Sequence, residues 1–321
     1  MILKQTAIKQ GLPKQAIEKD LWVTVMLQLL FSLPCAESLV FKGGTSLSKV
    51  WRLISRFSED IDIAIDRSLF GFEGILSKNK VSKLRKASST FVRDQLYQQL
   101  AEAINQSPLK DLCQIEPEPD GEGNATYPEP RSIFIEYHSV FADKLDYIPP
   151  VVKIEAGARS LLEPCEETHI TSIVEETLPT ISTTIDDVRI KTAIAEKTFL
   201  EKAFLLHELF SVNSNVEARR RSRHIYDLHM MLQQGIADKA IPNEGLWQTI
   251  HNHRATLTSM SGVDYSKDIR KNIQLIPPSE SLDSWKKDYE DMSSAMIYGE
   301  KPVFAELIYS MNWLELLFRK V

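Results

Sequence analysis

Two short motifs in this chain contain residue types that handle phosphate. The first is Gly43-Gly44-Thr45-Ser46, which follows an apolar stretch ending at Phe41 and one lysine. Glycines permit a tight turn and let a ligand come close to the backbone. The N–H groups that open the next helix, together with the hydroxyls of Thr45 and Ser46, form an anion site that suits phosphate. The motif therefore predicts that Gly43, Gly44, Thr45 and Ser46 bind a nucleotide phosphate.

The second motif is a strand that carries two carboxylates. Polar and apolar residues alternate from Asp60 to Ile65, so Asp60 and Asp62 share one face and the isoleucines face the core. Adjacent carboxylates repel each other, and a divalent cation relieves that repulsion. Taken singly, the glycine motif is also typical of a plain strand-to-helix turn, and the acidic pair of a solvated face. Because both lie in one strand–turn–helix–strand unit, they indicate an enzyme that transfers a phosphorus-containing group.

The order and approximate spacing of these motifs resemble the DNA polymerase β superfamily. More specifically, Phe41–Lys49 and Arg56–Asp62 resemble the AbiEii/AbiGii-type nucleotidyltransferase toxins of bacterial abortive-infection systems. The step from Thr45 to Asp60 is longer than is usual in the superfamily, which implies an extended helix that we expect over Thr45–Ile54. The resemblance also implies a polymerase β-like nucleotidyltransferase core with a mixed sheet, followed by a mainly helical C-terminal half.

Three further stretches resemble motifs of the same toxin family, and each also has an ordinary structural explanation. Glu18–Val23 precedes the glycine turn and is equally typical of a surface charge triplet beside a core tryptophan. Val151–Glu155 is an expected strand in which Lys153 and Glu155 share a face, which also fits a solvated pair on an edge strand. Glu201-Lys202 lies on an expected helix, where an ordinary surface lysine is the alternative.

The resemblance assigns these residues roles in a nucleotidyl transfer. It implies that Asp60 and Asp62 bind two Mg²⁺ ions, and that Glu155 binds the catalytic metal or acts as the base for the attacking hydroxyl. Lys202 would serve the nucleoside triphosphate, and Asp227 would position Lys202. The implied reaction transfers a nucleoside monophosphate from a nucleoside triphosphate to an acceptor and releases pyrophosphate.

The helix that carries Lys202 is expected to begin at Thr198. Thr198 can cap this helix, and Glu201, three residues later, can complete a capping box. Lys202 would then lie in the first turns, where a cation gains nothing from the helix dipole. A phosphate nearby would explain a lysine in that position.

The densest basic cluster comprises Arg219, Arg220, Arg221 and Arg223, and it runs into Arg223–Leu228, the last stretch that resembles the family. Since the net charge is −6, an RNA partner must meet a local basic patch of this kind. A solvated helix start is the alternative explanation for these arginines. On a helix, Arg223 can also pair with an aspartate four residues later.

Composition bounds the class of protein. The 321 residues include 43% apolar ones, which suffices for a substantial core and for two domains. No apolar run is long enough to span a membrane, and the first residues show no signal-peptide pattern. Three cysteines, Cys35, Cys113 and Cys165, lack metal-ligand spacing, which favours a reducing cytoplasm.

Along the chain, we expect an α/β (α+β) protein with four regions: an N-terminal helical segment (1–34), a nucleotidyltransferase core (35–160), a connector (161–194) and a helical C-terminal domain (195–321). In the core we expect a long helix over Val81–Ile104 and a hairpin that joins Cys113–Ile115 to Ser132–Tyr137. The helices expected in the C-terminal half are Thr198–Phe210, His224–Gln234, Glu244–Arg254, Leu282–Ile297 and Pro302–Arg319.

The resemblance implies a toxin opposed by an antitoxin, with tRNA as the acceptor and a role in growth arrest or phage defence. Two other classes fit the same residues. One is a nucleotidyltransferase that modifies a protein or a small molecule such as an antibiotic. A closed acidic or apolar pocket would indicate a small molecule, whereas RNA needs a broad basic surface. The other class is a non-catalytic nucleotide-binding module, against which the two repelling carboxylates argue.

Overall fold

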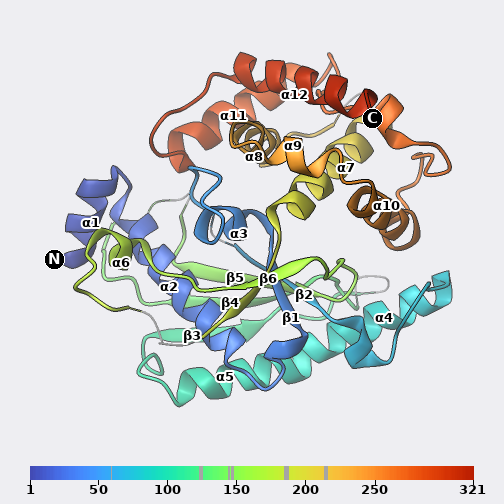
Figure 1. Ribbon diagram of the computed structural model, residues 1–321. Helices are drawn as coiled ribbons and strands as arrows, with labels where there is room; N and C mark the ends of the chain where they lie inside the picture. The colour runs from blue at the N-terminus through green and yellow to red at the C-terminus, as the bar shows by residue number, and fades with distance from the viewer. Residues whose placement is uncertain (59, 123–125, 144, 146–147, 184–187, 213–215) are drawn as a thin grey trace. The chain divides into compact units, whose positions relative to one another are not determined.

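The computed structural model describes residues 1–58, 60–122, 126–143, 145, 148–183, 188–212 and 216–321 (Figure 1). These divide into two units, Met1–Val50 with Phe57–Ala193, and Trp51–Arg56 with Ile194–Val321. Glu59 of the stretch Arg56–Asp62, and Gly123 and Asn124 of the expected hairpin turn, lie outside the described residues.

In its described residues, the first unit is built on a seven-stranded mixed sheet in the order β3-β4-β5-β2-β1-β7-β6. β2 is parallel to β5, and β1 to β7, whereas the other neighbours are antiparallel. The strands are β1 (Leu39–Lys42), β2 (Asp60–Ile65), β3 (Cys113–Pro117), β4 (Arg131–Tyr137), β5 (Val151–Gly157), β6 (Cys165–Thr168) and β7 (Ile190–Ala193). The predicted mixed sheet and the predicted antiparallel pairing of β3 with β4 are confirmed.

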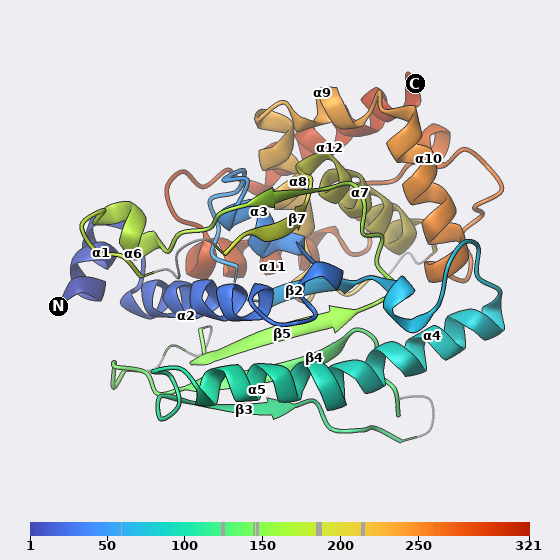
Figure 2. The ribbon, with the colours of Figure 1, turned by 60° about the horizontal axis from the view of Figure 1, so that its bottom comes forward.

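Three helices of the first unit, α2 (Lys14–Phe31), α4 (Lys78–Phe91) and α5 (Tyr97–Asn105), pack against strands of this sheet. α2 and α5 also contact each other. α4 runs into α5 through a π-helical turn, Val92–Leu96, so the long helix predicted here is present as one continuous rod (Figure 2). The smaller elements are α1 (Ile2–Gln10), α3 (Gly43–Lys49), α6 (Ile173–Thr177) and 3₁₀ turns at Ala36–Ser38 and Arg67–Phe70.

Alternation along β2 divides its side chains between two environments. Ile61 and Ile63 are buried, whereas Asp60 and Asp62 are partly exposed. Ile61 pairs across the ladder with Ile154 of β5, which is also buried. Branched apolar side chains pack well against a pleated surface. One face of the central strands is therefore apolar core, and the opposite face carries the aspartates.

The second unit is helical, as predicted for the C-terminal half. Its helices are α7 (Ala195–Val212), α8 (Ser222–Gln233), α9 (Ile236–Ala240), α10 (Glu244–His253), α11 (Leu282–Met296) and α12 (Phe304–Arg319), with a π-helical turn at Arg254–Thr258 and a 3₁₀ turn at Ile269–Asn272. Trp247, Trp285 and Phe318 are among its largest fully buried side chains. No helix in the described residues is both long enough and apolar enough to cross a membrane.

The segment between the two motifs departs from the prediction. α3 ends at Lys49, whereas the helix was expected to continue to Ile54. Arg52 has a φ of 53°, a left-handed conformation that a right-handed helix cannot contain. Residues Trp51–Arg56 are instead part of the second unit. The extra length of chain ahead of Asp60 is therefore not an extended helix.

The start of α7 also departs from the prediction. The helix begins at Ala195, three residues before Thr198, and the Thr198 hydroxyl donates to the carbonyl of Ile194 in the preceding turn. The predicted capping box at Thr198 and Glu201 is therefore wrong. Lys202 lies in the third turn of the helix, where the dipole of the helix end is no longer felt strongly. Its position needs another explanation, which its side-chain partners provide.

Candidate active site

The first unit brings the predicted carboxylates together on one face of the sheet. In the parallel ladder of β2 and β5, Asp60 pairs with Lys153 and Asp62 pairs with Glu155. Residues that pair across adjacent strands point to the same face. Asp60, Asp62, Lys153 and Glu155 are all partly exposed there. We refer to these four residues as the carboxylate face.

Gly43 lies against the carboxylate of Asp62. Its φ is +79°, which a residue with a side chain rarely adopts. A Cβ atom at this position would stand 2.0 Å from Asp62 Oδ2. The glycine is therefore required both by the backbone conformation and by the space that the aspartate occupies. This contact joins the glycine turn directly to the carboxylate face.

The hydroxyls of the glycine motif are used within the protein. Thr45 and Ser46 are buried. The Thr45 hydroxyl donates to the backbone carbonyl of Asp60 and lies 2.9 Å from Ser58 Oγ, and the Ser46 hydroxyl donates to the carbonyl of Gly43 at 2.8 Å. These bonds fasten the turn to the start of β2. The role of Gly44, Thr45 and Ser46 in phosphate binding stays a prediction, with backbone N–H groups as its main donors.

Glu155 has a lysine partner in this structure. Lys153 Nζ donates to Glu155 Oε1 at 2.8 Å. Burial lowers the pKa of Lys153, but the hydrogen bond to Glu155 and the charges of Glu155 and Asp60 raise that pKa above its ordinary value. The alternative explanation was a Lys153–Glu155 pair on an edge strand. The pair is confirmed, but the edge position is wrong, because β5 lies between β4 and β2.

The residues present fit a divalent cation bound by two protein carboxylates. In the described part of the chain, no group of three or more His, Cys, Asp and Glu side chains is arranged to hold a metal ion. Mg²⁺ keeps several waters and is commonly bound through one or two carboxylates together with substrate phosphates. Asp60 and Asp62, which share one face, supply that number. Glu155, engaged by Lys153, does not complete a preformed three-carboxylate site.

The charged triplet Glu18, Lys19 and Asp20 is buried, so the explanation as a surface triplet is wrong. Lys19 Nζ donates to the carbonyl of Pro149 at 3.1 Å, just before β5 begins. Asp20 Oδ1 accepts from Lys49 Nζ at 2.6 Å, at the end of α3. Within the first unit, the triplet therefore anchors both the helix after the glycine turn and the strand that carries Glu155.

The second unit brings Lys202 and Asp227 together with a residue that had no predicted role. Lys202 Nζ lies 2.9 Å from Asp227 Oδ2. Arg56 forms two parallel bonds to the same carboxylate, from Nε at 2.7 Å and from Nη2 at 2.9 Å. The side chains of Arg56 and Asp227 are only 2% and 0% exposed. We refer to Arg56, Lys202, Asp227 and the neighbouring His224 as the buried charge cluster.

Electrostatics keep Asp227 ionised despite its burial. Desolvation raises the pKa of Asp227, but the charges and hydrogen bonds of Arg56 and Lys202 outweigh it and lower that pKa. Burial and the charge of Arg56 lower the pKa of Lys202, although Asp227 opposes them. Burial, then the charge of Lys202, lower the pKa of His224 well below its ordinary value, so this imidazole is neutral. Its Nδ1 lies 3.4 Å from Lys202 Nζ.

Sequence reasoning missed Arg56. It stands shortly before the second motif and 171 residues before its partner Asp227, and no local pattern links the two. The signal available was its place in the stretch Arg56–Asp62, which resembles the toxin family. Asp227 thus has two cationic partners in the structure, Arg56 and Lys202. Its pairing with the helical neighbour Arg223 stays a prediction.

Comparisons with known proteins identify the family of this chain. The family model described as "Nucleotidyl transferase AbiEii toxin, Type IV TA system" matches residues 27–313. The chain belongs to this family. Among solved structures, it is similar to MenT4, a nucleotidyltransferase toxin from Mycobacterium tuberculosis H37Rv, with a TM-score of 0.58, 13% identity, and coverage of 99% of this chain and 89% of that chain. At that identity the likeness shows the fold alone. A search of curated proteins gives no match.

As a member of the AbiEii family, the chain is a nucleotidyltransferase toxin of a type IV toxin–antitoxin system, which implies a nucleoside triphosphate substrate and an antitoxin. Of the arginines predicted to contact RNA, Arg219, Arg220 and Arg221 precede α8, and Arg223 lies in its first turn. Arg219, Arg220 and Arg221 are exposed, and Arg223 is half-buried. The Asp288 carboxylate accepts from the backbone N–H groups of Arg220 at 2.6 Å and Ser222 at 3.0 Å. The backbone of the cluster is therefore held, while the first three side chains reach solvent.

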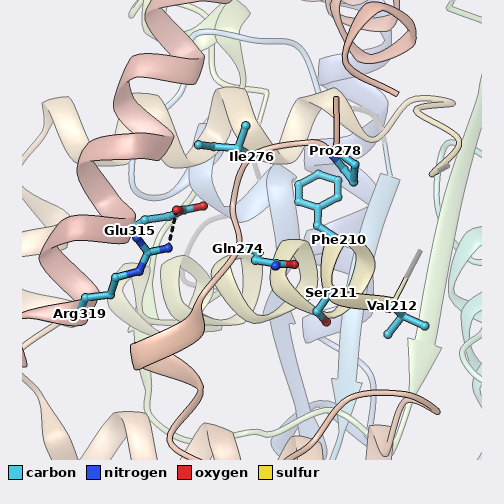
Figure 3. Close-up of a pocket in the computed structure, with 8 residues that line it drawn as sticks. All are labelled: Phe210, Ser211, Val212, Gln274, Ile276, Pro278, Glu315 and Arg319. Carbon is cyan, nitrogen blue, oxygen red and sulfur yellow. Dashed lines mark hydrogen bonds and ion pairs between the residues drawn. The ribbon is translucent and has the colours of Figure 1, made fainter. Parts of the chain in front are cut away.

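The second unit of this AbiEii member also contains a cavity of about 490 Å³ (Figure 3). It lies between the end of α7, the segment 274–278 and α12, and it is lined by Phe210, Ser211, Val212, Gln274, Ile276, Pro278, Glu315 and Arg319. An ion pair of 2.7 Å joins Glu315 to Arg319 at its wall. No residue predicted for the active site lines this cavity.

Proposed function

We propose that this protein transfers a nucleoside monophosphate from a magnesium-bound nucleoside triphosphate to an RNA acceptor, with tRNA as the RNA class. The observation that carries the proposal is the contact of Gly43 with Asp62, which joins a turn suited to phosphate to a pair of carboxylates suited to a metal. Transfer of a nucleotidyl group requires positioning and charge neutralisation more than covalent chemistry by the protein.

Asp60 and Asp62 are the residues proposed to hold Mg²⁺. When bound there, the metal would neutralise triphosphate charge and orient the phosphorus for in-line attack. The backbone N–H groups at Gly43 and Gly44 are proposed to donate to phosphate oxygens. Glu155 is proposed as the base or a further metal ligand, roles that require its release from Lys153.

Lys202 is proposed as the cation that meets the triphosphate. Asp227 fixes the position of its ammonium group, and Arg56 keeps Asp227 ionised by sharing the same carboxylate. A lysine binds phosphate through a single point charge, so the strength of that interaction depends on where the ammonium group is held. These three residues lie in the second unit, and the proposal that they serve the same reaction as the aspartates rests on the family resemblance.

The choice of RNA rests on the exposed arginines. Because the net charge is −6, an RNA must meet a local basic surface, and Arg219, Arg220 and Arg221 offer one. Growth arrest, and defence against phage, would follow from modification of a tRNA that translation requires. Modification of a protein or a small molecule is the second candidate.

Label transfer distinguishes these acceptors. The full-length protein is incubated with Mg²⁺ and each α-³²P-labelled nucleoside triphosphate, together with total cellular RNA, total protein or a small-molecule extract. Label in RNA of tRNA size, absent with the Asp62→Ala variant, is the expected result. Label that appears only in protein or in small molecules would overturn the choice of RNA and establish the second candidate.

A further inference from the structure

β5 places a positive charge inside the carboxylate face. Lys153 pairs across the ladder with Asp60, and its ammonium group bonds Glu155 on its own strand at 2.8 Å. The side chains of Lys153 and Glu155 are 35% and 27% exposed, so ions in solution can reach them. A lysine is not required there by packing, because every second residue of β5 from Val152 onward already supplies the buried apolar side.

The charges on this face explain what the lysine does. Asp60, Asp62 and Glu155 carry three negative charges on two adjacent strands, and the charge of Glu118 also acts on Lys153. Neighbouring carboxylates repel each other, and a cation between them relieves that repulsion. Lys153 supplies one such cation permanently. It also occupies Glu155, the carboxylate that would otherwise stand beside Asp62 as a third metal ligand.

We infer that Lys153 takes the place of a second divalent cation in the nucleotide-free protein. Asp60 and Asp62 then hold one divalent ion, and Glu155 is reserved for Lys153. Any second metal must arrive with the nucleoside triphosphate, because phosphate oxygens then supply the ligands that Glu155, bonded to Lys153, does not provide. This inference rests on the proposed function and deepens it, because it names the residue that sets how many metal ions the free enzyme binds.

Direct binding of Mn²⁺ to the full-length, nucleotide-free protein tests the inference. The number of bound ions and their Kd are measured by calorimetry and by the electron paramagnetic resonance signal of free Mn²⁺. Wild type is expected to bind one ion. Lys153→Met removes a positive charge and releases Glu155, so it is expected to bind Mn²⁺ roughly tenfold more tightly or to bind a second ion.

Two further variants make the result specific. Lys191 is a matched control, because it is a lysine on strand β7 of the same unit, 28% exposed and near Glu37. Lys191→Met is expected to leave Mn²⁺ binding unchanged. In the double variant Lys153→Met with Glu155→Gln, the gain in affinity should be lost, since the released carboxylate is missing.

Unchanged or weaker Mn²⁺ binding by Lys153→Met would overturn the inference, and so would an equal gain in Lys191→Met or no Mn²⁺ binding in any variant. The label-transfer experiment separates this from the proposed function. Transfer of label with no change in Mn²⁺ binding by Lys153→Met refutes the inference alone. Tighter Mn²⁺ binding without transfer of label to any acceptor refutes the proposed function alone.

Discussion

The carboxylate face and the buried charge cluster differ in how far their charged side chains are exposed and in how completely they are paired. On the carboxylate face, acidic side chains are partly exposed along two strands, and one lysine partly balances them. In the cluster, one carboxylate with no exposed surface is shared by Arg56 and Lys202. The carboxylates of the carboxylate face are accessible to a ligand, whereas the carboxylate of the buried charge cluster is already bound by cationic side chains of the protein.

The difference teaches where function and stability are separable. Removing a partly exposed, repelling carboxylate leaves no unpaired buried charge, so the fold should tolerate it. Removing one member of a buried ion pair leaves its partner charged and desolvated, which is strongly destabilising. Variants of the two regions should therefore differ in kind, and the predictions below run from the largest expected effect to the smallest.

Replacing either aspartate should abolish activity without loss of stability. Asp60→Ala and Asp62→Ala are each expected to reduce pyrophosphate release at least about a thousandfold, or about 4 kcal/mol, because each removes a proposed metal ligand. The Tm should stay the same or rise, since a repulsion is relieved. Glu136→Ala, at an exposed carboxylate of β4, is the control. Activity that survives in either aspartate variant would contradict the metal assignment.

Replacing Arg56 should instead lower stability. Arg56→Met removes two hydrogen bonds from the buried Asp227 carboxylate and is expected to cost about 3 kcal/mol of unfolding free energy in urea titration. The control is Arg93→Met, which breaks bonds to Asp94 and Asp120 in a solvent-exposed setting and should change stability little. Equal losses in the two variants would remove the distinction between the regions.

The carboxylate face was predictable because strand alternation is local. The period of two from Asp60 to Ile65 is visible in the sequence, and it determines which side chains share a face. The pairing of Lys153 with Glu155 was predictable for the same reason, because alternation along β5 puts both side chains on one face. Burial of Glu18, Lys19 and Asp20 was not, because such residues are rarely buried and their partners lie far along the chain.

The buried charge cluster was predictable only in part. Lys202 and Asp227 were expected to work together from family resemblance, whereas the bond between Arg56 and Asp227 spans 171 residues and leaves no periodic trace. The start of α7 was misplaced because Thr198 and Glu201 mimic a capping box inside a helix that begins earlier. The excursion of Trp51–Arg56 was missed because nothing in its sequence marks the left-handed Arg52.

Lys202 tests whether the cluster also serves the nucleotide. Lys202→Met leaves Asp227 paired with Arg56, so the protein should fold, while Mg²⁺-dependent binding of nucleoside triphosphate should weaken roughly tenfold or more. Calorimetry with and without Mg²⁺ measures the effect. Lys197→Met is a matched control, because Lys197 is a buried lysine on the same helix, 3.2 Å from Glu201. Equal affinity in wild type and Lys202→Met would return Lys202 to a purely structural role.

The buried charge cluster should also make stability depend on pH. The pKa of His224 is lowered by burial and by the charges of Lys202, Arg223 and Arg56, against the opposing charge of Asp227. Below about pH 6.5, His224 binds a proton in the unfolded chain but not in the folded protein. The free energy of unfolding therefore falls as pH drops, by about 1.4 kcal/mol per pH unit for one histidine.

The His224→Gln variant isolates this contribution. His207 and His229 also have lowered pKa values because of burial, so the wild-type slope includes their protons as well. Unfolding free energies between pH 5 and 7 should show a slope smaller by about one proton in the variant. Identical slopes would mean that His224 is protonated in the folded protein, and that it does not accept a hydrogen bond from Lys202.

The smallest expected effect belongs to the exposed arginines, which lie outside both regions. Replacing Arg219, Arg220 and Arg221 together with Ala should weaken tRNA binding several-fold and reduce the slope of log affinity against log salt by roughly 2, since each arginine releases less than one counterion. The fold should survive, because Asp288 holds this segment through backbone N–H groups. Nucleoside triphosphate and Mn²⁺ binding should be unchanged.

A matched triple variant removes the same charge elsewhere. Lys78, Lys80 and Lys83 are exposed on α4 of the first unit, so their replacement by Ala lowers the net charge equally. If both triple variants weaken tRNA binding to the same extent, RNA responds only to total charge and the arginines are a solvated helix start. A loss confined to the arginine variant would show that an acidic protein recruits RNA through one local patch, separate from both the open and the buried charges.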